Sequence, residues 1–300
     1  MVNLLPFIIK GGEALAVKKY FDHIQLKERT FTAEVTLDYF NKRLKIDDYR
    51  GDVGSLLVAI NEFIQTHSFT KGIVKVRNEH IHTFLQHGFM VEAVFQKLFN
   101  GSDAYCMCKY YDDSRYTSNN WIEEDKILTA VQKLEDSDLR AQLPDGYIVR
   151  KATHADANHL AKLYATVFEI YPTPLNDPKY ITKIINNGTI FFVVEHQAEI
   201  VSAASAEINQ EYNNAELTDC ATLTQHRKFG LMKILLLQLE QELINHNIYC
   251  AYSIARALSY GMNAVLKQLG YSYTGRLKNN CYIFDKLEDM NVWVKDLSSN

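Results

Sequence analysis

The stretch Thr222-Leu-Thr-Gln-His-Arg227-Lys-Phe-Gly230-Leu-Met232 joins two contrasting patterns in the sequence. Residues 215–223 before it read as a strand, and residues 230–247 after it carry an apolar-heavy face at helical spacing. The first amides of a helix have no internal acceptor, and the helix dipole adds partial positive charge there. This junction is therefore predicted to bind an anion.

Two features of the junction favour a diphosphate as that anion. Gly230 lets the backbone approach a ligand closely, because glycine has no Cβ. Arg227 and Lys228 add mobile positive charge next to the helix start.

The elements expected around this junction follow the order β-α-α-β-β-β-α-β-α-β-β. Thr153 and Asp156 have near capping-box spacing before one of the helices. The expected strands are 147–152, 189–195, 199–208, 215–223, 248–254, 271–277 and 289–297, and the expected helices are 160–168, one ending near 188, 230–247 and 261–269. This order predicts an α/β (α+β) fold with a mixed central sheet flanked by helices.

The composition indicates a folded protein without a strongly basic surface. The chain has 300 residues, of which 47% are hydrophobic and 23% charged, and its net charge is −4. A nucleic-acid partner is not expected from that charge. No apolar run is long enough to span a membrane, and the first ten residues lack the pattern of a signal peptide. The five cysteines are expected to be reduced thiols, and Cys106 and Cys108 a buried pair rather than metal ligands. A cytoplasmic location follows as an expectation.

Turn signals and composition divide the chain into three parts. Residues 112–145 are polar and contain one amphipathic pattern, 122–134, that predicts a connector helix. Pro144-Asp-Gly146 is a turn signal that we take as the boundary of the last domain. The expected parts are therefore 1–111, a connector at 112–145, and 146–300.

The second half resembles the GNAT superfamily of N-acetyltransferases. Arg227-x-x-Gly230-x-Met232 is similar to its pyrophosphate loop, Gln/Arg-x-x-Gly-x-Gly/Ala, although Met232 stands where the family has a small residue. Leu269-Gly270-Tyr271 is similar to the Leu-Gly-Phe that ends a helix of the family. The resemblance implies acetyl-CoA as co-substrate and no metal. It assigns acetyl-CoA binding to Thr222, Leu223, Arg227, Lys228, Phe229, Gly230, Leu231, Met232 and Asn263, with the amides near Thr222 and Leu223 as oxyanion and pantetheine contacts.

Longer strings resemble the β-lysine N6-acetyltransferases within that superfamily. They are Ala215-Glu-Leu-Thr-Asp219-Cys-Ala-Thr-Leu223, Ala255-Arg-Ala-Leu-Ser-Tyr-Gly-Met-Asn263, Gly275-Arg-Leu-Lys-Asn-Asn280-Cys and Glu288-Asp-Met-Asn-Val-Trp-Val294. The resemblance implies transfer of acetyl to the terminal amine of β-lysine, (3S)-3,6-diaminohexanoate. The product would be N6-acetyl-β-lysine, a compatible solute.

Acetylation of an amine first requires a base. An ammonium with a pKa near 10.4 costs about 4.6 kcal/mol to deprotonate at pH 7. Glu216 is the first candidate base, since several GNAT enzymes carry a catalytic Glu at that distance from the loop, and Asp219 is the second. Strict strand alternation places the two on opposite faces unless a bulge intervenes. The tyrosine that many family members use to protonate the leaving thiolate is replaced by Leu266, which leaves Tyr260, Tyr271 or water.

Candidate substrate-binding residues follow from the charges of β-lysine. Arg256 is a candidate clamp for the carboxylate, or else a surface arginine. Glu288 and Asp289 are candidates for the second ammonium, or else a solvated acidic turn. Asn279, Asn280 and Asn291 offer neutral polar contacts, and Tyr171 lies in a proline-rich loop that is a candidate lid.

Residues 31–111 resemble a degenerate copy of the second half. The segment from Gly88-Phe89 to Lys109 parallels that from Gly270-Tyr271 to Lys295. Asp52 would put a negative charge into the corresponding diphosphate cradle, so this half is expected not to bind CoA productively. Its presence leaves alternatives to β-lysine open: another small amine, a protein lysine, or a non-catalytic CoA-binding module. The oligomeric state, a homodimer included, is also open.

Overall fold

The computed structural model describes residues 20–136, 142–284 and 286–298, which form two compact units. The first unit contains the described residues up to Val91 together with Tyr105–Thr117. The second contains Glu92–Ala104 and the described residues from Ser118 onward. Part of the expected connector, residues 137–141, lies outside the described residues.

The second unit is built on a mixed sheet. Its strands are β5 (Met90–Phe99, from Glu92), β7 (Tyr147–Lys151), β8 (Ile190–His196), β9 (Glu199–Asn209), β10 (Asn214–Thr222), β11 (Cys250–Arg256), β12 (Ser272–Ile283) and β13 (Lys286–Asp296). They lie in the order β5-β12-β13-β11-β10-β9-β8-β7. Among the described residues, neighbouring strands of this sheet pair antiparallel, except β10 and β11, which pair in parallel. The predicted fold class and element order of this half are confirmed.

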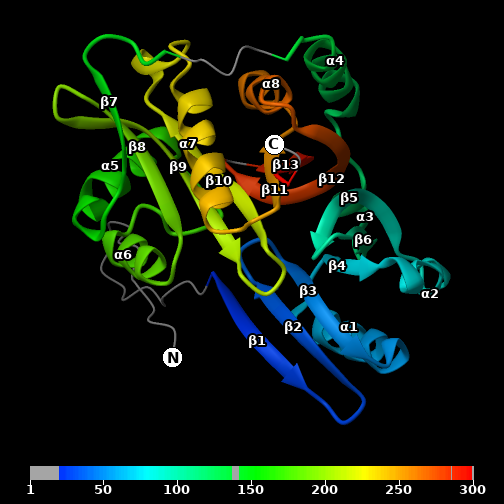
Figure 1. Cartoon of the computed structure of the whole chain (residues 1–300). Helices are drawn as coiled ribbons and strands as arrows, with labels where there is room; N and C mark the ends of the chain where they lie inside the picture. Colours follow the sequence, from blue (N-terminus) through cyan, green and yellow to red (C-terminus); the bar gives the residue numbers. More distant parts are fainter. Residues whose placement is uncertain (1–19, 137–141, 285, 299–300) are drawn as a thin grey trace, which may run out of the picture. The chain divides into compact units, whose positions relative to one another are not determined.

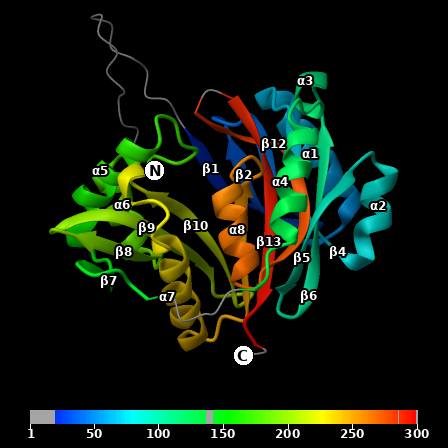
Figure 2. The ribbon, with the colours of Figure 1, turned by 90° about the horizontal axis from the view of Figure 1, so that it is seen from above.

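Helices cover both faces of this sheet (Figures 1 and 2). They are α4 (Trp121–Gln132), α5 (Ala157–Val167), α6 (Pro178–Asn186), α7 (Leu231–Asn245) and α8 (Tyr260–Gln268). Strand alternation divides the core between the two faces. Phe192 and Val194 of β8 pack in one cluster with α7 and α8, whereas Phe191 and Val193 pack in another with α5 and α6.

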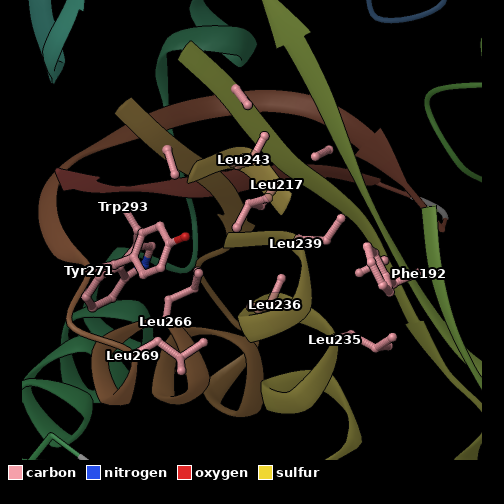
Figure 3. Close-up of a cluster of buried hydrophobic side chains, with 14 of the residues drawn as sticks. Phe192, Leu217, Leu235, Leu236, Leu239, Leu243, Leu266, Leu269, Tyr271 and Trp293 are labelled. Atoms are coloured by element: carbon pink, nitrogen blue, oxygen red, sulfur yellow. The ribbon is translucent and has the colours of Figure 1, made fainter. Parts of the chain in front are cut away.

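The larger of the two clusters surrounds α7. Leucines 235, 236, 239 and 243 of that helix meet Phe192 and Leu217 of the sheet (Figure 3). Leu266, Tyr271 and Trp293 close the cluster beside α8. Val131 of α4 belongs to it as well and is fully buried. The connector helix is therefore part of the core of the second unit.

The first unit repeats the element order of the second. It contains β1 (Phe21–Lys27), β2 (Phe31–Asp38), β3 (Arg43–Gly51), α1 (Val53–His67), β4 (Lys71–Arg77), α2 (Ile81–Gln86), most of β6 (Ser102–Tyr110) and the short α3 (Asp113–Tyr116). β1, β2 and β3 are antiparallel, and β3 pairs with β4 in parallel. The series β8, β9, β10, α7, β11 has the same order and the same directions.

Most element boundaries lie within three residues of the predicted ones, and two differences are larger. β12 continues to Ile283 rather than ending near 277, because a shift of register between Leu277 and Cys281 lets the strand run on through the two asparagines. Residues 92–104 and 118–136 belong to the same compact unit as 142–298, since Ala93 of β5 pairs with Gly275 of β12. Gly275 permits that approach, because a Cβ there would lie 2.1 Å from the Glu92 carbonyl oxygen.

Candidate active site

The predicted anion site lies at the start of α7. A short 3-10 turn, Thr224–His226, follows β10, and then Lys228 and Gly230 both adopt left-handed backbone conformations. Gly230 precedes the helix, its carbonyl accepts the first helical bond from Ile234, and the space where its Cβ would be is open. The amides of the first helical turn have no acceptor within the helix, and the open space at Gly230 lets a ligand approach them.

The side chains of the loop divide between solvent and core. Lys228 and Phe229 are exposed, and exposed Arg227 donates from Nε to the Thr222 carbonyl oxygen at 3.2 Å. This bond holds Arg227 beside the helix start. Leu231 is buried, and Met232 packs against the core around α7, so a large residue fits where the family has a small one. These two residues offer a ligand only their backbone.

One predicted backbone contact is wrong. The resemblance implies oxyanion and pantetheine contacts from the amides near Thr222 and Leu223, but the Leu223 amide donates to the Val201 carbonyl oxygen at 2.9 Å. The Thr222 hydroxyl is likewise engaged with Ser202 at 2.7 Å. The pairing of β10 with β9 thus continues through this segment, which removes the Leu223 amide from the candidate oxyanion donors.

Strands β10 and β11 open into a fork beside this loop. They pair over three positions only, from Asn214–Cys250 to Glu216–Tyr252. Beyond that point the Ser253 hydroxyl donates to the Leu217 carbonyl oxygen at 2.7 Å, across the start of the fork. An extended ligand can therefore enter between the two strands and meet backbone groups that have lost their ladder partners.

A bulge in β10 brings Glu216 and Asp219 to one face. The register with β9 shifts between Thr218 and Ala221, and Asp219 has a left-handed backbone. Leu217 packs on the α7 side, whereas Ala221 packs with α5 and α6. The extra residue lets Glu216 and Asp219 both face the α5–α6 side, and the charge of Glu216 raises the Asp219 pKa. Alternation without the bulge would have separated them.

Asp219 is a buried carboxylate with organised neighbours. It accepts a hydrogen bond from the Ser205 hydroxyl at 2.7 Å and one from Tyr171 at 3.3 Å. The Tyr164 hydroxyl donates to its backbone carbonyl at 2.7 Å. Burial and the charge of Glu216 raise its pKa to about 6, although both hydroxyls act in the opposite direction. A carboxylate of that pKa can accept a proton near neutral pH.

Tyr171 connects the proline-rich loop to this carboxylate. Its hydroxyl reaches Asp219, and its ring packs on Phe168 with centroids 4.6 Å apart. The Phe284 amide donates to the Ile170 carbonyl oxygen, which ties the loop to the β12–β13 hairpin. Burial, followed by the charge of Asp219, raises the pKa of Tyr171 well above its usual range. The loop therefore lies over the site, as a lid would, in this structure.

Arg256 and Glu288 form a partly buried ion pair at the end of β11. Arg256 Nη2 lies 3.0 Å from Glu288 Oε1, and the guanidinium sits over the Phe284 ring at 4.9 Å. Glu288 is 2% exposed. Arg256 Nε and Glu288 Oε2 have no hydrogen-bond partner among the described residues. The pair therefore leaves a buried guanidinium N–H and a buried carboxylate oxygen available. The N–H can bind a carboxylate and the oxygen can bind an ammonium.

Two residues, Cys281 and Tyr171, connect this pair to Asp219. Cys281 faces Glu288 directly across β12 and β13, a separation of about 5 Å between Cβ atoms. The same thiol interacts electrostatically with Tyr171, which contacts Asp219. The two sets of predicted residues, base and substrate clamp, are thus brought together by Tyr171 and Cys281.

Asp289 points to a different part of the unit. It accepts hydrogen bonds from the Ser118 hydroxyl at 2.5 Å and from the Asn279 amide at 2.6 Å. Glu124 of α4 interacts with it and lies 3.4 Å from Arg276. Burial and the charge of Asp289 raise the Glu124 pKa to about 8. Glu124 is not among the residues predicted from the sequence, because a glutamate in a polar connector has the pattern of a solvated charge. Asp289 and Asn279 serve here as internal supports, and Asn280 is buried beside them in β12.

Asn263, predicted to bind the cofactor, and Asn291, predicted to contact the substrate, belong instead to an internal network. Asn263 is fully buried and donates to the carbonyl oxygens of Arg256 and Ser259 at 2.9 and 2.8 Å. Its own oxygen accepts from Asn291 at 2.9 Å and from Trp293 at 2.8 Å. With both amide hydrogens and the oxygen occupied, Asn263 has no group left for a cofactor. This corrects its predicted role, and it orients the end of β11 instead.

The candidate thiolate acids separate by burial. Leu266 is fully buried in the core around α7, and Tyr271 is 2% exposed in the same cluster (Figure 3). Tyr260, the first residue of α8, is 47% exposed. Of the two tyrosines, Tyr260 is therefore the one whose side chain is accessible to a ligand. Among the described residues, no group of three metal-ligating side chains occurs and no helix is long and apolar enough to cross a membrane.

Comparison with known proteins identifies related sequences. The model of the acetyltransferase (GNAT) family matches residues 157–271. The N-acetyltransferase YodP of Bacillus subtilis (strain 168) is 37% identical over 272 residues, which cover 91% of this chain and 98% of that protein. The beta-lysine N(6)-acetyltransferase of Methanosarcina mazei is 36% identical over 230 residues, covering 70% and 85%. The protein of the same name from Methanococcus maripaludis is 32% identical over 261 residues, covering 87% and 95%.

Proposed function

We propose that this chain, which belongs to the GNAT family of acetyltransferases, transfers acetyl from acetyl-CoA to the terminal amine of β-lysine. The family assignment makes it an acetyl-CoA-dependent N-acetyltransferase with the GNAT fold. Two relatives that share 32% and 36% identity with it are named for β-lysine. The product would be N6-acetyl-β-lysine, a compatible solute, made in the cytoplasm.

The Arg256–Glu288 pair is the observation that carries this choice of acceptor. A buried pair that leaves a guanidinium N–H and a carboxylate oxygen unsatisfied would be costly without a ligand. The carboxylate of β-lysine can accept from Arg256, and its 3-ammonium can donate to Glu288. A protein lysine side chain offers neither group near its amine, so the pair favours a small amino acid.

Residues in and around the fork account for cofactor binding, deprotonation of the amine and stabilisation of the oxyanion. The first turn of α7, with Arg227 and Lys228, fits the diphosphate of acetyl-CoA, and the fork between β10 and β11 fits the pantetheine arm. Asp219 takes the proton from the ammonium, directly or through water, with Tyr171 and Ser205 fixing its orientation. The bulge leaves the backbone of Asp219 and Cys220 outside the register with β9, which makes its amides the candidate oxyanion donors.

Tyr260 then stands as the proton source for the leaving thiolate. It lies at the start of α8, directly after the end of β11, and is the exposed tyrosine of the two considered. Acetyl passes directly from sulfur to nitrogen, so the chain needs no covalent acyl intermediate. Cys220 agrees with this, because burial raises the pKa of its thiol and disfavours a thiolate nucleophile.

The test is CoA release from acetyl-CoA by the purified protein with β-lysine, α-lysine and 1,5-diaminopentane. The diamine lacks the carboxylate, and α-lysine carries its second amine one carbon closer to that carboxylate. Selective turnover of β-lysine is the expected result. Preferred turnover of either competitor would keep the reaction and discard the acceptor, and turnover of no amine would favour a CoA-binding module.

A further inference from the structure

An aromatic and imidazole cluster adjoins the loop before α7, and only its member Phe229 is among the residues predicted to bind acetyl-CoA. Its members come from three segments of the second unit: Tyr147 begins β7, His196 ends β8, and His226 and Phe229 lie in the loop. The Tyr147 hydroxyl is 2.8 Å from His226 Nδ1. The His196 and Tyr147 ring centroids are 4.5 Å apart, and those of the two histidines 5.3 Å apart.

Phe229 is the exposed member of this cluster. Its ring centroid lies 6.0 Å from that of Tyr147 at an interplanar angle of 44°, and the residue is 48% exposed. An exposed large apolar ring immediately before Gly230 contributes little to the core. It presents a flat apolar face next to the position of the diphosphate.

The charge of the loop also leaves part of CoA unmatched. The diphosphate meets the amides of α7 and Arg227, but CoA also carries a 3′-phosphate of charge about −1.5 to −2 on its ribose. Lys228 is exposed and precedes Phe229 in the loop, and the imidazoles of His196 and His226 contact the same Tyr147 ring as Phe229. Imidazoles can donate hydrogen bonds to a phosphate when neutral and also attract it when protonated.

We propose that Phe229 stacks on the adenine of acetyl-CoA and that His196 and His226 bind its 3′-phosphate. Tyr147 is a positioning residue, because its hydroxyl holds His226 and its ring supports both His196 and Phe229. The subsite is continuous with the diphosphate loop through residues 226–230. This inference rests on the acetyl-CoA dependence of the family and not on the identity of the acceptor.

The test measures binding in the absence of an acceptor, by calorimetry with three ligands. CoA carries every group, dephospho-CoA lacks the 3′-phosphate, and 4′-phosphopantetheine lacks the nucleoside, the 3′-phosphate and one phosphate of the diphosphate. Phe229→Ala is expected to lower the affinity for CoA and dephospho-CoA by about tenfold, the range of aromatic–base stacking. The affinity for 4′-phosphopantetheine should not change. His196→Gln combined with His226→Gln is expected to weaken CoA but not dephospho-CoA.

The matched control is Tyr249→Ala, which removes an aromatic ring of similar exposure, 50%, just before β11. It should leave all three affinities unchanged. If Phe229→Ala weakened the binding of all three ligands equally, Phe229 would act by maintaining the loop conformation, and the adenine contact would be overturned. Equal weakening of CoA and dephospho-CoA by the histidine variant would overturn the phosphate contact. Because no acceptor is present, these results do not depend on whether β-lysine is the substrate.

Discussion

The environment of each carboxylate at the fork determines its role in the reaction. Asp219 and Glu216 are both carboxylates of one strand, yet Asp219 is 5% exposed and Glu216 is half-buried. Burial of Asp219 disfavours its charged form, and the nearby charge of Glu216 adds to that effect. We infer that Asp219 is the base and that Glu216 tunes it.

Substitution of each carboxylate by its amide separates these roles. Asp219→Asn is expected to lower kcat by about 100-fold or more, since no group replaces the lost base, while CoA affinity is kept. Wild-type activity should fall as the pH drops through about 6, because Asp219 becomes protonated there. Glu216→Gln removes the like charge, lowers the Asp219 pKa and should shift that acid limb to lower pH. Loss of activity in Glu216→Gln with activity retained in Asp219→Asn would reverse the assignment.

Helix α4 shows how an element outside the matched family region supports the site. It lies before residue 157, where the match to the family begins, yet it contributes Val131 to the main core. Trp121 stacks under the Arg276 guanidinium at 4.7 Å, and Arg276 Nε donates to Asn291 at 3.0 Å. The helix therefore holds β12 and β13 in the register that carries Glu288.

Glu124 makes the packing of this helix sensitive to pH. Its pKa is raised from the usual 4.5 to about 8, so the folded chain keeps a proton that the unfolded chain releases. Stability should therefore fall as the pH rises from about 4.5 to about 8. Glu124→Gln keeps the size and shape of the side chain but removes its ionisable carboxyl group. The Tm of this variant should exceed that of wild type by about 4 °C at pH 8 and by little at pH 5.

The control for this comparison is Glu123→Gln in the same helix. The Glu123 side chain is 60% exposed and pairs with Lys126 at the surface, so its replacement should shift Tm equally little at both pH values. Thermal unfolding followed by circular dichroism provides the measurement. If the difference in Tm between Glu124→Gln and wild type were the same at pH 5 and pH 8, the raised pKa of Glu124 would be contradicted.

For the molecule as a whole, the repeated element order supports the hypothesis of a partial duplication over residues 31–111. The first unit has its own fork, since β3 and β4 pair only from Arg43–Lys71 to Ile46–Val74. Asp48 is paired with Arg77 at 2.6 Å where that fork opens, and Asp52 caps α1 by accepting from the Ser55 amide at 2.6 Å. The protein's own carboxylate occupies the helix start, so we propose that this unit has a structural role.

Removal of everything before residue 146 tests how far the second unit depends on the rest of the chain. The fragment 146–300 would lose Val131 from the core, the partner of Gly275 in β5, and Glu124 beside Arg276. We expect a fragment that is insoluble or unfolded and shows no CoA release, compared with the full chain purified in the same way. A soluble fragment with full turnover would show that the earlier segments are dispensable.

Local patterns were sufficient for the element order of the second half and for the loop before α7. The reason is that a strand, a glycine with a left-handed backbone and a helix start are all defined by neighbours in sequence. The strings around Asp219 and Asn263 likewise led to the correct family. The roles of single residues within those strings could not be obtained in this way.

Only the tertiary structure decided which side chains meet. A bulge placed Glu216 and Asp219 on one face, the pairing with β9 consumed the Leu223 amide, and the Asn263 side chain turned inward. Each of these outcomes depends on partners that lie far away in sequence, such as Val201 and Trp293. Glu124 is the plainest case, because its burial comes from strands more than a hundred residues later, and nothing in its own neighbourhood distinguishes it from a solvated glutamate.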